Sequence, residues 1–407
     1  MYRLVQRRGI IGLFCLLFVA SSVVPGWAQK DNRFEVSKNL DIFNSLLKEV
    51  EMFYVDSVDV DKTVQRGIEA MLAGLDPYTE YYPEQKTEEL SLMTTGEYGG
   101  IGSLIRQRNN EGGVMIAEPT EGMPADLAGL KPGDLILAID TIDVSKATNS
   151  RVSELLKGVP NTKMVLTIQR PGEKKPRKFE ITRKQITTPQ VTYYGVKNDS
   201  IGYIYLKAFT IKSAQEVKEA FLDLKKNHNI KSLVLDLRGN GGGVLEGAVQ
   251  IVGMFVPKGS EVLSTKGKIK QWDRTYRTST EPLDTVMPLA ILINGGTASA
   301  AEIVSGSLQD MDRAVLVGQR SFGKGLVQAP RDLPYNGKVK ITMSKYYIPS
   351  GRCIQQIDYS HRKEDGSVAA IPDSLTSVFY TSKKRPVRDG AVSYTHLRAH
   401  ETELHLV

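Results

Sequence analysis

The spacing of hydrophobic residues changes twice along the chain. Between residues 31 and about 90, apolar positions recur every three or four residues, as in amphipathic helices. From about residue 93 to 185 the apolar runs are short and separated by turns, with only two stretches suited to helices. Beyond residue 188, apolar strands lead into glycine-rich loops and helix starts. The pattern therefore predicts a helical segment, a small β-rich domain and a core of strand–loop–helix units.

One of these units carries a candidate nucleophile. Residues 289–294 form an apolar run typical of a buried strand, and the two glycines that follow predict a tight turn. Ser299 then falls at the N-terminus of a helix. The unpaired N–H groups there, including that of Ala300, face any negative charge that forms beside the hydroxyl, as an oxyanion hole requires. A small residue that merely eases a helix start is the alternative interpretation.

A second unit carries a candidate base. A strand over residues 313–317 leads into the loop that contains Lys324, and Gln328 follows four residues later. Lysine accepts a proton only when it is neutral, and burial or a hydrogen bond to an uncharged amide favours the neutral amine. Lys324 could then take the proton of Ser299, with Gln328 as its partner.

The loop before Lys324 also matches most of the phosphate-binding pattern G-x-x-x-x-G-K-[ST]. Gly325 occupies the position of the hydroxyl that holds magnesium, and Pro330 interrupts the helix that should cradle the phosphates. We therefore disfavour a nucleotide site.

A third unit supplies glycines near a strand end. Residues 232–237 predict a strand, and residues 238–243 form a glycine-rich loop that precedes a helix near Val244. Such a loop brings bare N–H groups close to a ligand, so Gly242 or a neighbour is a candidate second oxyanion donor. A purely structural turn is the alternative. The spacing does not fit a dinucleotide site, because Val244 stands where a third small residue belongs.

The sequence offers few residues suited to other classes of hydrolase. His228 and His361 lie in polar runs typical of the surface, and the remaining histidines are close to the end of the sequence, at His396, His400 and His405. No G-x-S-x-G sequence surrounds Ser299, and no histidine or cysteine cluster has metal-ligand spacing. These features disfavour a Ser-His-Asp triad and metal-dependent hydrolysis, and they imply no cofactor.

Residues 236–243, 294–302 and 321–328 resemble, in order and spacing, the motifs of the carboxy-terminal processing proteases, also called tail-specific proteases. The resemblance implies a serine nucleophile, a lysine base, a glutamine that orients the lysine, and an oxyanion hole built from two backbone N–H groups. Carried over motif by motif, these roles fall on the following residues: Ser299, Lys324, Gln328, Gly242 and Ala300.

The β-rich segment resembles a PDZ domain, a module that adds a peptide as an extra strand and binds its terminal carboxylate with loop N–H groups. Its candidate carboxylate loop consists of Tyr98, Gly99, Gly100, Ile101 and Gly102. The resemblance therefore implies protein or peptide partners with free, apolar carboxyl ends. A small β domain with a glycine turn is the alternative interpretation.

Both ends of the chain differ from the rest. Residues 1–28 combine a basic start, an apolar run and a small-x-small site at their end, which predicts a signal peptide and export to the bacterial periplasm or cell envelope. An uncleaved anchor is the alternative, although the apolar run is short for one. Cys15 would leave with the signal, so Cys353 would have no disulfide partner. Residues 392–407 resemble a translated sequencing adapter.

The formal net charge of +7 includes three arginines of that signal segment, and no basic stripe interleaved with aromatics suggests nucleic acid. We expect an exported serine endopeptidase whose α/β core is crotonase-like, built of ββα units. Its predicted parts are a signal peptide (1–28), an N-terminal helical segment (31–90), a PDZ-like domain (91–187), a truncated peptidase core (188–391) and an adapter-derived tail (392–407). By the family resemblance, the helical segment can mediate self-association. A noncatalytic PDZ-type scaffold is the competing function.

Overall fold

The computed structural model describes residues 33–108, 112–364, 366–393 and 397–398. The chain divides into two compact units, residues 1–68 and 69–407. Helix α2 (Arg33–Phe53) has no buried residue, and α3 (Val60–Ala73) runs across the division between the units. The predicted signal peptide lies outside the described residues. None of the helices that the structure describes has the length and apolarity needed to cross a membrane.

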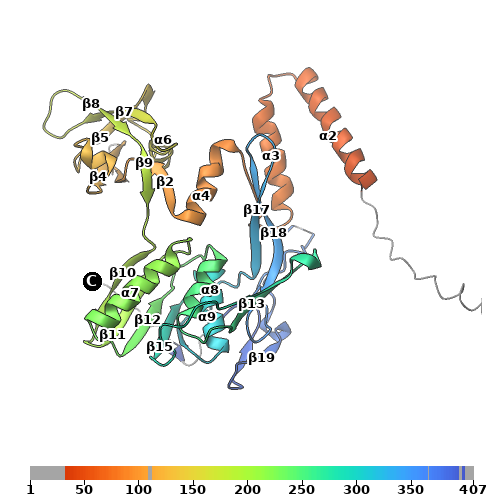
Figure 1. Ribbon diagram of the computed structural model, residues 1–407. Helices are drawn as coiled ribbons and strands as arrows, with labels where there is room; N and C mark the ends of the chain where they lie inside the picture. The colour runs from red at the N-terminus through yellow and green to blue at the C-terminus, as the bar shows by residue number, and fades with distance from the viewer. Residues whose placement is uncertain (1–32, 109–111, 365, 394–396, 399–407) are drawn as a thin grey trace, which may run out of the picture. The chain divides into compact units, whose positions relative to one another are not determined.

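The PDZ-like segment folds around one antiparallel sheet. Its strand order is β3-β4-β5-β7-β8, with the short β6 paired to β5. Alternate residues of β7 are buried, as expected for a sheet with one face on a core. Two helices, α5 and α6, complete the segment, and α6 is labelled in Figure 1. The elements span β3 (Ser103–Gln107), β4 (Val114–Pro119), α5 (Pro124–Leu127), β5 (Leu135–Ile139), β6 (Ile142–Asp143), α6 (Asn149–Leu156), β7 (Lys163–Gln169) and β8 (Arg177–Thr182).

A separate two-stranded ladder joins the two ends of this segment. Strand β2 (Glu97–Gly100) pairs antiparallel with β9 (Lys184–Thr187). The 3-10 turn η1 (Glu84–Lys86) and helix α4 (Thr87–Thr95) precede β2.

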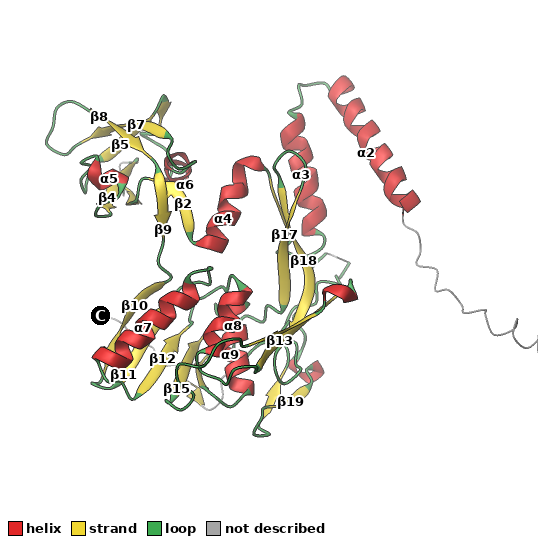
Figure 2. Cartoon of the chain, viewed as in Figure 1, coloured by secondary structure: helices red, strands yellow, loops and turns green. Residues whose placement is uncertain are grey.

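The core contains a six-stranded sheet in the order β10-β11-β12-β15-β16-β21. Strands β10 and β11 pair antiparallel, and every later neighbour in this order pairs parallel. Figure 2 shows the alternation of these strands with helices. The elements span β10 (Val191–Lys197), β11 (Ile201–Leu206), α7 (Ser213–Asn227), β12 (Ser232–Asp236), α8 (Leu245–Gly253), β15 (Leu289–Ile293), α9 (Ala300–Asp310), β16 (Val315–Gly318) and β21 (Leu397–Arg398).

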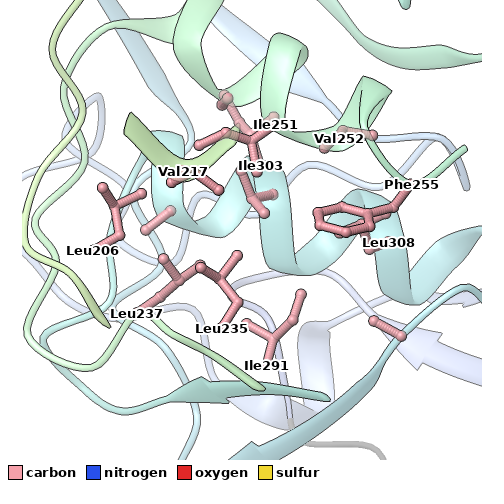
Figure 3. Close-up of a cluster of buried hydrophobic side chains, with 14 of the residues drawn as sticks. Leu206, Val217, Leu235, Leu237, Ile251, Val252, Phe255, Ile291, Ile303 and Leu308 are labelled. Atoms are coloured by element: carbon pink, nitrogen blue, oxygen red, sulfur yellow. The ribbon is translucent and has the colours of Figure 1, made fainter. Parts of the chain in front are cut away.

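Helices α7, α8 and α9 bury their apolar faces against this sheet. In Figure 3, Val217 of α7, Ile251 of α8 and Ile303 of α9 face Leu235 and Ile291 of the strands, and all five side chains are at most 1% exposed. Burying one such side chain contributes roughly 1.5–3 kcal/mol. This packing fixes the N-terminal end of α9, where Ser299 lies.

A second, five-stranded sheet borders the core. Its order is β1-β18-β13-β14, and β17 pairs with β18 as a long hairpin (Figure 1). The remaining pair, β19 and β20, forms a short hairpin. These elements span β1 (Glu80–Tyr82), β13 (Glu261–Gly267), the 3-10 turn η2 (Lys270–Trp272), β14 (Arg274–Arg277), β17 (Leu326–Asp332), β18 (Lys338–Tyr347), the 3-10 turn η3 (Asp373–Leu375), β19 (Val378–Tyr380) and β20 (Pro386–Arg388).

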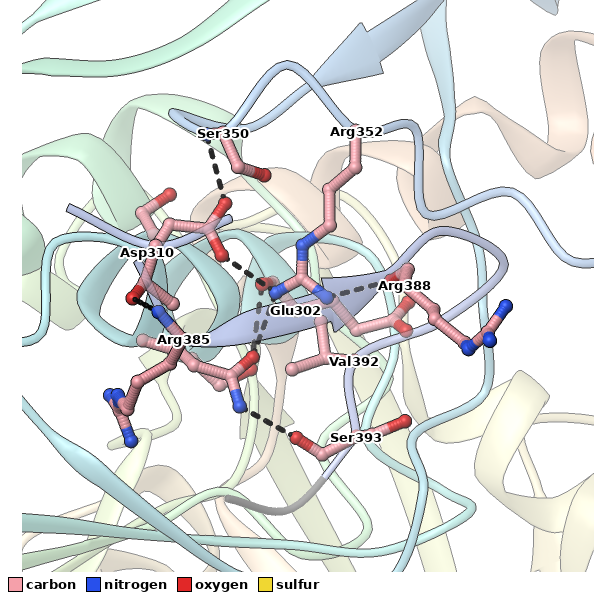
Figure 4. Close-up of polar contacts among 12 residues, drawn as sticks. Glu302, Asp310, Ser350, Arg352, Arg385, Arg388, Val392 and Ser393 are labelled. Carbon is pink, nitrogen blue, oxygen red and sulfur yellow. Dashed lines mark hydrogen bonds and ion pairs between the residues drawn. The ribbon is translucent and has the colours of Figure 1, made fainter. Parts of the chain in front are cut away.

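A buried ion pair holds the last part of the chain against the C-terminal end of α9. Arg352 is 1% exposed and donates to the Asp310 carboxylate at 2.8 Å and to the Arg388 carbonyl at 2.8 Å (Figure 4). Asp310 also accepts the N–H of Ser350. A buried charge left without its partner is strongly destabilising, so we infer that this pair keeps the segment in one place.

Most predicted core elements appear with small shifts. The predicted strand over 289–294 is β15, the helix after Ser299 begins at Ala300, and the segment after Lys324 is the strand β17. Helical periodicity does not extend over residues 80–82, which form β1 because they pair with β18.

At the other end of the chain, Val392 is fully buried and bonds through its N–H to the Ser321 hydroxyl. The predicted adapter-derived tail thus begins with a residue that packs in the core. Most of that tail lies outside the described residues.

Candidate active site

Ser299 stands at the turn between β15 and α9 with a strained backbone. Its φ of 54° and ψ of −118° are uncommon for a residue with a side chain. Its N–H donates to Glu302 Oε2 at 2.8 Å, and no helical bond engages the N–H of Ala300. In the described part of the chain this Ala300 N–H has no acceptor. It is therefore free to bind an oxyanion beside the serine hydroxyl.

The glycine-rich loop after β12 lies directly against Ser299. A Cβ atom on Gly242 would come within 2.7 Å of Ser299 Cβ and 2.9 Å of the Ala300 nitrogen, so only glycine fits there. The N–H of Gly242 donates to Asn240 Oδ1 at 2.9 Å, and the buried Asn240 amide also donates to the Leu206 carbonyl. Gly242 therefore lies close to Ser299 and Ala300, as predicted, but its N–H already has an acceptor.

Lys324 lies in the loop between β16 and β17. Its N–H donates to Glu302 Oε2 at 2.9 Å, and its Nζ lies 4.1 Å from the centroid of the Tyr78 ring. Burial lowers the pKa of Lys324 to about 8, and the charge of Lys340 acts in the same direction. A sizeable fraction of the amine is therefore neutral slightly above neutral pH.

The three predicted catalytic side chains come from adjoining loops and strands, but no hydrogen bond joins them. Gln328 on β17 donates from Nε2 to Thr342 Oγ1 at 3.1 Å. Among the described residues, Lys324 Nζ has a hydrogen bond neither to the Ser299 hydroxyl nor to the Gln328 amide. The amine instead faces the Tyr78 ring.

The candidate carboxylate loop of the PDZ-like segment has two available donors. Gly99 and Gly100 are part of β2, whereas Ile101 and Gly102 follow it. Within the described residues, the N–H groups of Ile101 and Gly102 have no acceptor, although both carbonyls accept bonds. Gly102 has a φ of 66°, and a Cβ there would come within 2.4 Å of Met123 Cβ. Tyr98 is half-buried, and burial raises its pKa.

Comparison with known proteins places this chain in a family. The description "Peptidase family S41" matches residues 200–360, and "PDZ domain" matches residues 115–170. A "Carboxy-terminal-processing protease" of Bartonella bacilliformis is 36% identical over 345 residues, which cover 84% of this chain and 77% of the relative. The chain belongs to peptidase family S41. It is similar to the carboxy-terminal-processing proteases, so the predicted family is confirmed.

Two further proteins similar to this S41 chain match it over different shares of their own lengths. A "Probable CtpA-like serine protease" of Staphylococcus aureus is 33% identical over 78% of this chain, but the match spans only 62% of that relative's length. Among solved structures, the photosystem II D1 C-terminal processing protease is 29% identical over 76% of this chain and 82% of its own, with a TM-score of 0.42. The family assignment rests on the sequence relationships.

Two residues of the candidate site were not identified from the sequence. Glu302 is fully buried, and its carboxylate accepts the N–H groups of Ser299, Gly323 and Lys324 and the hydroxyl of Ser321. Burial raises the pKa of Glu302 to about 7, although these hydrogen bonds oppose the rise. The pattern Ser-x-x-Glu at a helix start is a capping-box signal that could have identified it.

The second missed residue, Tyr346 of β18, is 1% exposed. Its hydroxyl lies 2.6 Å from the Lys324 carbonyl oxygen and 3.2 Å from that of Ser299. No local sequence signal marks it, because its contacts reach 22 and 47 residues along the chain.

The histidines and the cysteine set aside in the sequence form no hydrogen bond to Ser299 or Lys324 in the described part of the chain. His228 and His361 are exposed, and each faces a nearby aspartate at the surface. Cys353 is partly buried, and burial raises the pKa of its thiol, which disfavours a reactive thiolate. The other three histidines lie outside the described residues.

Proposed function

We propose that this S41 chain is a serine endopeptidase that cleaves carboxy-terminal regions of proteins through an acyl-enzyme intermediate. Ser299 is the nucleophile, Lys324 the general base, and Gln328 orients the lysine. Ala300 and Gly242 donate N–H groups to the oxyanion. The observation that carries the proposal is the unengaged N–H of Ala300 beside Ser299, because a helix N-terminus with a free donor stabilises developing negative charge.

In the proposed chemistry Lys324 carries one proton in each of two half-reactions. Ser299 Oγ attacks the scissile carbonyl carbon while neutral Lys324 takes the hydroxyl proton. The tetrahedral oxyanion collapses, the peptide C–N bond breaks, and the Lys324 ammonium gives its proton to the leaving amine. Water then attacks the Ser299 ester, Lys324 takes a proton from that water and returns it to Ser299, and the acid product leaves.

This chemistry requires two small rearrangements of the described site. Lys324 Nζ leaves the face of the Tyr78 ring and turns toward the Ser299 hydroxyl. The N–H of Gly242 exchanges Asn240 Oδ1 for the oxyanion. Both changes exchange existing contacts for contacts to bound substrate, so substrate binding can drive them.

Substrate choice falls to the PDZ domain. We propose that residues 98–102 bind a free carboxylate through the N–H groups of Ile101 and Gly102 while the peptide adds a strand to the domain. Apolar carboxyl ends are the expected ligands, since Ile101 itself is buried in the domain core and the loop borders that core.

We also propose the architecture of the core, the bounds of its parts and the cellular location of the protein. The succession β10, β11, α7 is consistent with crotonase-like ββα units. Residues 1–28 are proposed as a signal peptide that directs the protein to the bacterial periplasm or cell envelope, with residues 31–90, 91–187 and 188–391 as helical, PDZ and peptidase parts. Residues 392–407 are proposed to derive from an adapter. The exposed apolar side chains of α2, such as Leu40 and Phe43, are consistent with self-association.

The test is a cleavage assay on an unfolded protein substrate with a free apolar carboxyl end. The wild-type chain should cleave it, and Ser299→Ala should not, while both proteins bind the substrate. Binding without cleavage by the wild-type chain would instead support a noncatalytic PDZ scaffold.

A further inference from the structure

One oxygen atom of Glu302 connects the backbones of the proposed nucleophile and base. Oε2 accepts the N–H of Ser299 at 2.8 Å and the N–H of Lys324 at 2.9 Å. Its partner Oε1 accepts the N–H of Gly323 at 2.7 Å and the hydroxyl of Ser321. A fully buried carboxylate thus takes four donors, three of them from the lysine loop and one from the serine turn.

The hydroxyl of Tyr346 connects the same two residues through their carbonyl groups. Its oxygen lies within 2.6 Å of the Lys324 carbonyl and 3.2 Å of the Ser299 carbonyl, so its single proton is shared between them. Glu302 belongs to α9 and Tyr346 to β18. Two buried side chains from different elements therefore bridge one pair of residues, one through the N–H groups and the other through the carbonyls.

Little else joins the two segments directly. The N–H of Phe322 donates to the Thr297 carbonyl at 2.9 Å and the N–H of Gln319 to the Ile293 carbonyl at 3.0 Å, and both bonds lie at least two residues from Ser299 and Lys324. Ser299 and Lys324 are 25 positions apart. The Ser299 carbonyl accepts the N–H groups of Glu302 and Ile303 in the first turn of α9, whereas Lys324 lies in the loop between β16 and β17. The two bridges consequently act at the residues whose separation matters for proton transfer.

We propose that Glu302 and Tyr346 form a clamp that fixes the distance between Ser299 and Lys324. This inference rests on the proposed function of that pair. Both are positioning residues, because neither reaches the reacting atoms and each acts through the backbone. A displacement of about 1 Å at a catalytic group can cost roughly 100-fold in rate, so small changes in the clamp should be visible in kcat.

Tyr346→Phe is the sharpest probe, because it removes only the hydroxyl and keeps the ring that fills the core. We expect kcat to fall roughly 10- to 100-fold, with KM within about twofold of the wild-type value. The matched control is Tyr347→Phe on the same strand. The Tyr347 ring contacts Lys266, and its hydroxyl has no bond among the described residues, so its kcat should be unchanged.

Glu302→Gln tests the other half of the clamp. Glutamine has one acceptor oxygen and one NH₂ group, so one pair of donors loses its acceptor and faces another donor. We expect a loss of kcat at least as large as for Tyr346→Phe. Its control is Asp310→Asn, a buried carboxylate at the other end of α9, which should lower the melting temperature by breaking the pair with Arg352 but leave kcat of the folded protein unchanged.

All variants are assayed as full chains well below their melting temperatures, beside Ser299→Ala. A merely structural role would lower the melting temperature without changing kcat. If Ser299→Ala is inactive but Tyr346→Phe keeps kcat within about threefold of wild type, the clamp is refuted and the proposed function stands. If Ser299→Ala is as active as the wild-type chain, the proposed function and the clamp both fail. If Glu302→Gln does not fold, Tyr346→Phe decides.

Discussion

Lys324 Nζ lies over the face of the Tyr78 ring, 4.1 Å from its centroid. The ring face is electron-rich and stabilises the ammonium form, whereas burial favours the neutral amine and lowers the pKa of Lys324 to about 8. The hydroxyl of Tyr78 contacts that of Tyr359, and the two rings meet edge to face. Tyr78 therefore favours the protonated form of the proposed base.

Replacing Tyr78 with leucine should make Lys324 a better base at neutral pH. The variant removes the ring face but keeps an apolar neighbour, so the ammonium loses about 0.5–2 kcal/mol of stabilisation, or roughly 0.4–1.5 pKa units. The midpoint of the pH–rate curve should shift to lower pH by that amount. Tyr78→Phe, which keeps the ring, is the control and should leave the midpoint in place. An unchanged midpoint in both variants would remove the role assigned to Tyr78.

The wild-type enzyme should become more active as pH rises through about 8 and reach a plateau above about 9, where Lys324 is almost fully neutral. Lysine works only when neutral, and the lowered pKa of Lys324 sets the midpoint near about 8 instead of near its usual value. Rates of peptide cleavage under kcat/KM conditions between pH 6 and about 10 would measure this. Activity that falls over the same range would contradict a lysine base.

The sequence predicted the strand and helix around the proposed nucleophile because their signals are local. An apolar run, two glycines and a helix start predicted the position of Ser299, and the structure has β15 and α9 at those places. Gly325 and Pro330 correctly excluded the helix of a nucleotide-binding loop, since the strand β17 follows Lys324.

Contacts made through tertiary packing could not be predicted from local sequence patterns. Tyr346 is one of two adjacent tyrosines at the end of β18, and its two acceptors are known only once β18 lies beside the serine and lysine loops. The bond from Gly242 to Asn240 depends on the exact path of the glycine loop. Similarly, residues 80–82 become a strand only because β18 offers an edge to pair with, which overrides their helical spacing.

Peptide binding by the PDZ domain should require a free carboxyl end. Titration calorimetry on full-length Ser299→Ala, which binds without cleaving, can compare one apolar peptide in its acid and amide forms. Loss of a charge-assisted hydrogen bond to Ile101 or Gly102 costs about 1.5–3 kcal/mol, or roughly one to two decades in Kd. Equal Kd values for acid and amide would refute recognition of the carboxylate and leave the chemistry of Ser299 and Lys324 untouched.

The central claim is that Lys324 activates Ser299, and it is tested most directly by cleavage rates of Lys324→Ala and Lys324→Arg. Alanine supplies no base, and a guanidinium stays protonated, so neither side chain can take the serine proton. Both variants should be inactive at every pH while melting at a temperature close to that of the wild-type chain. Cleavage by either variant at a rate within about tenfold of wild type would contradict the account.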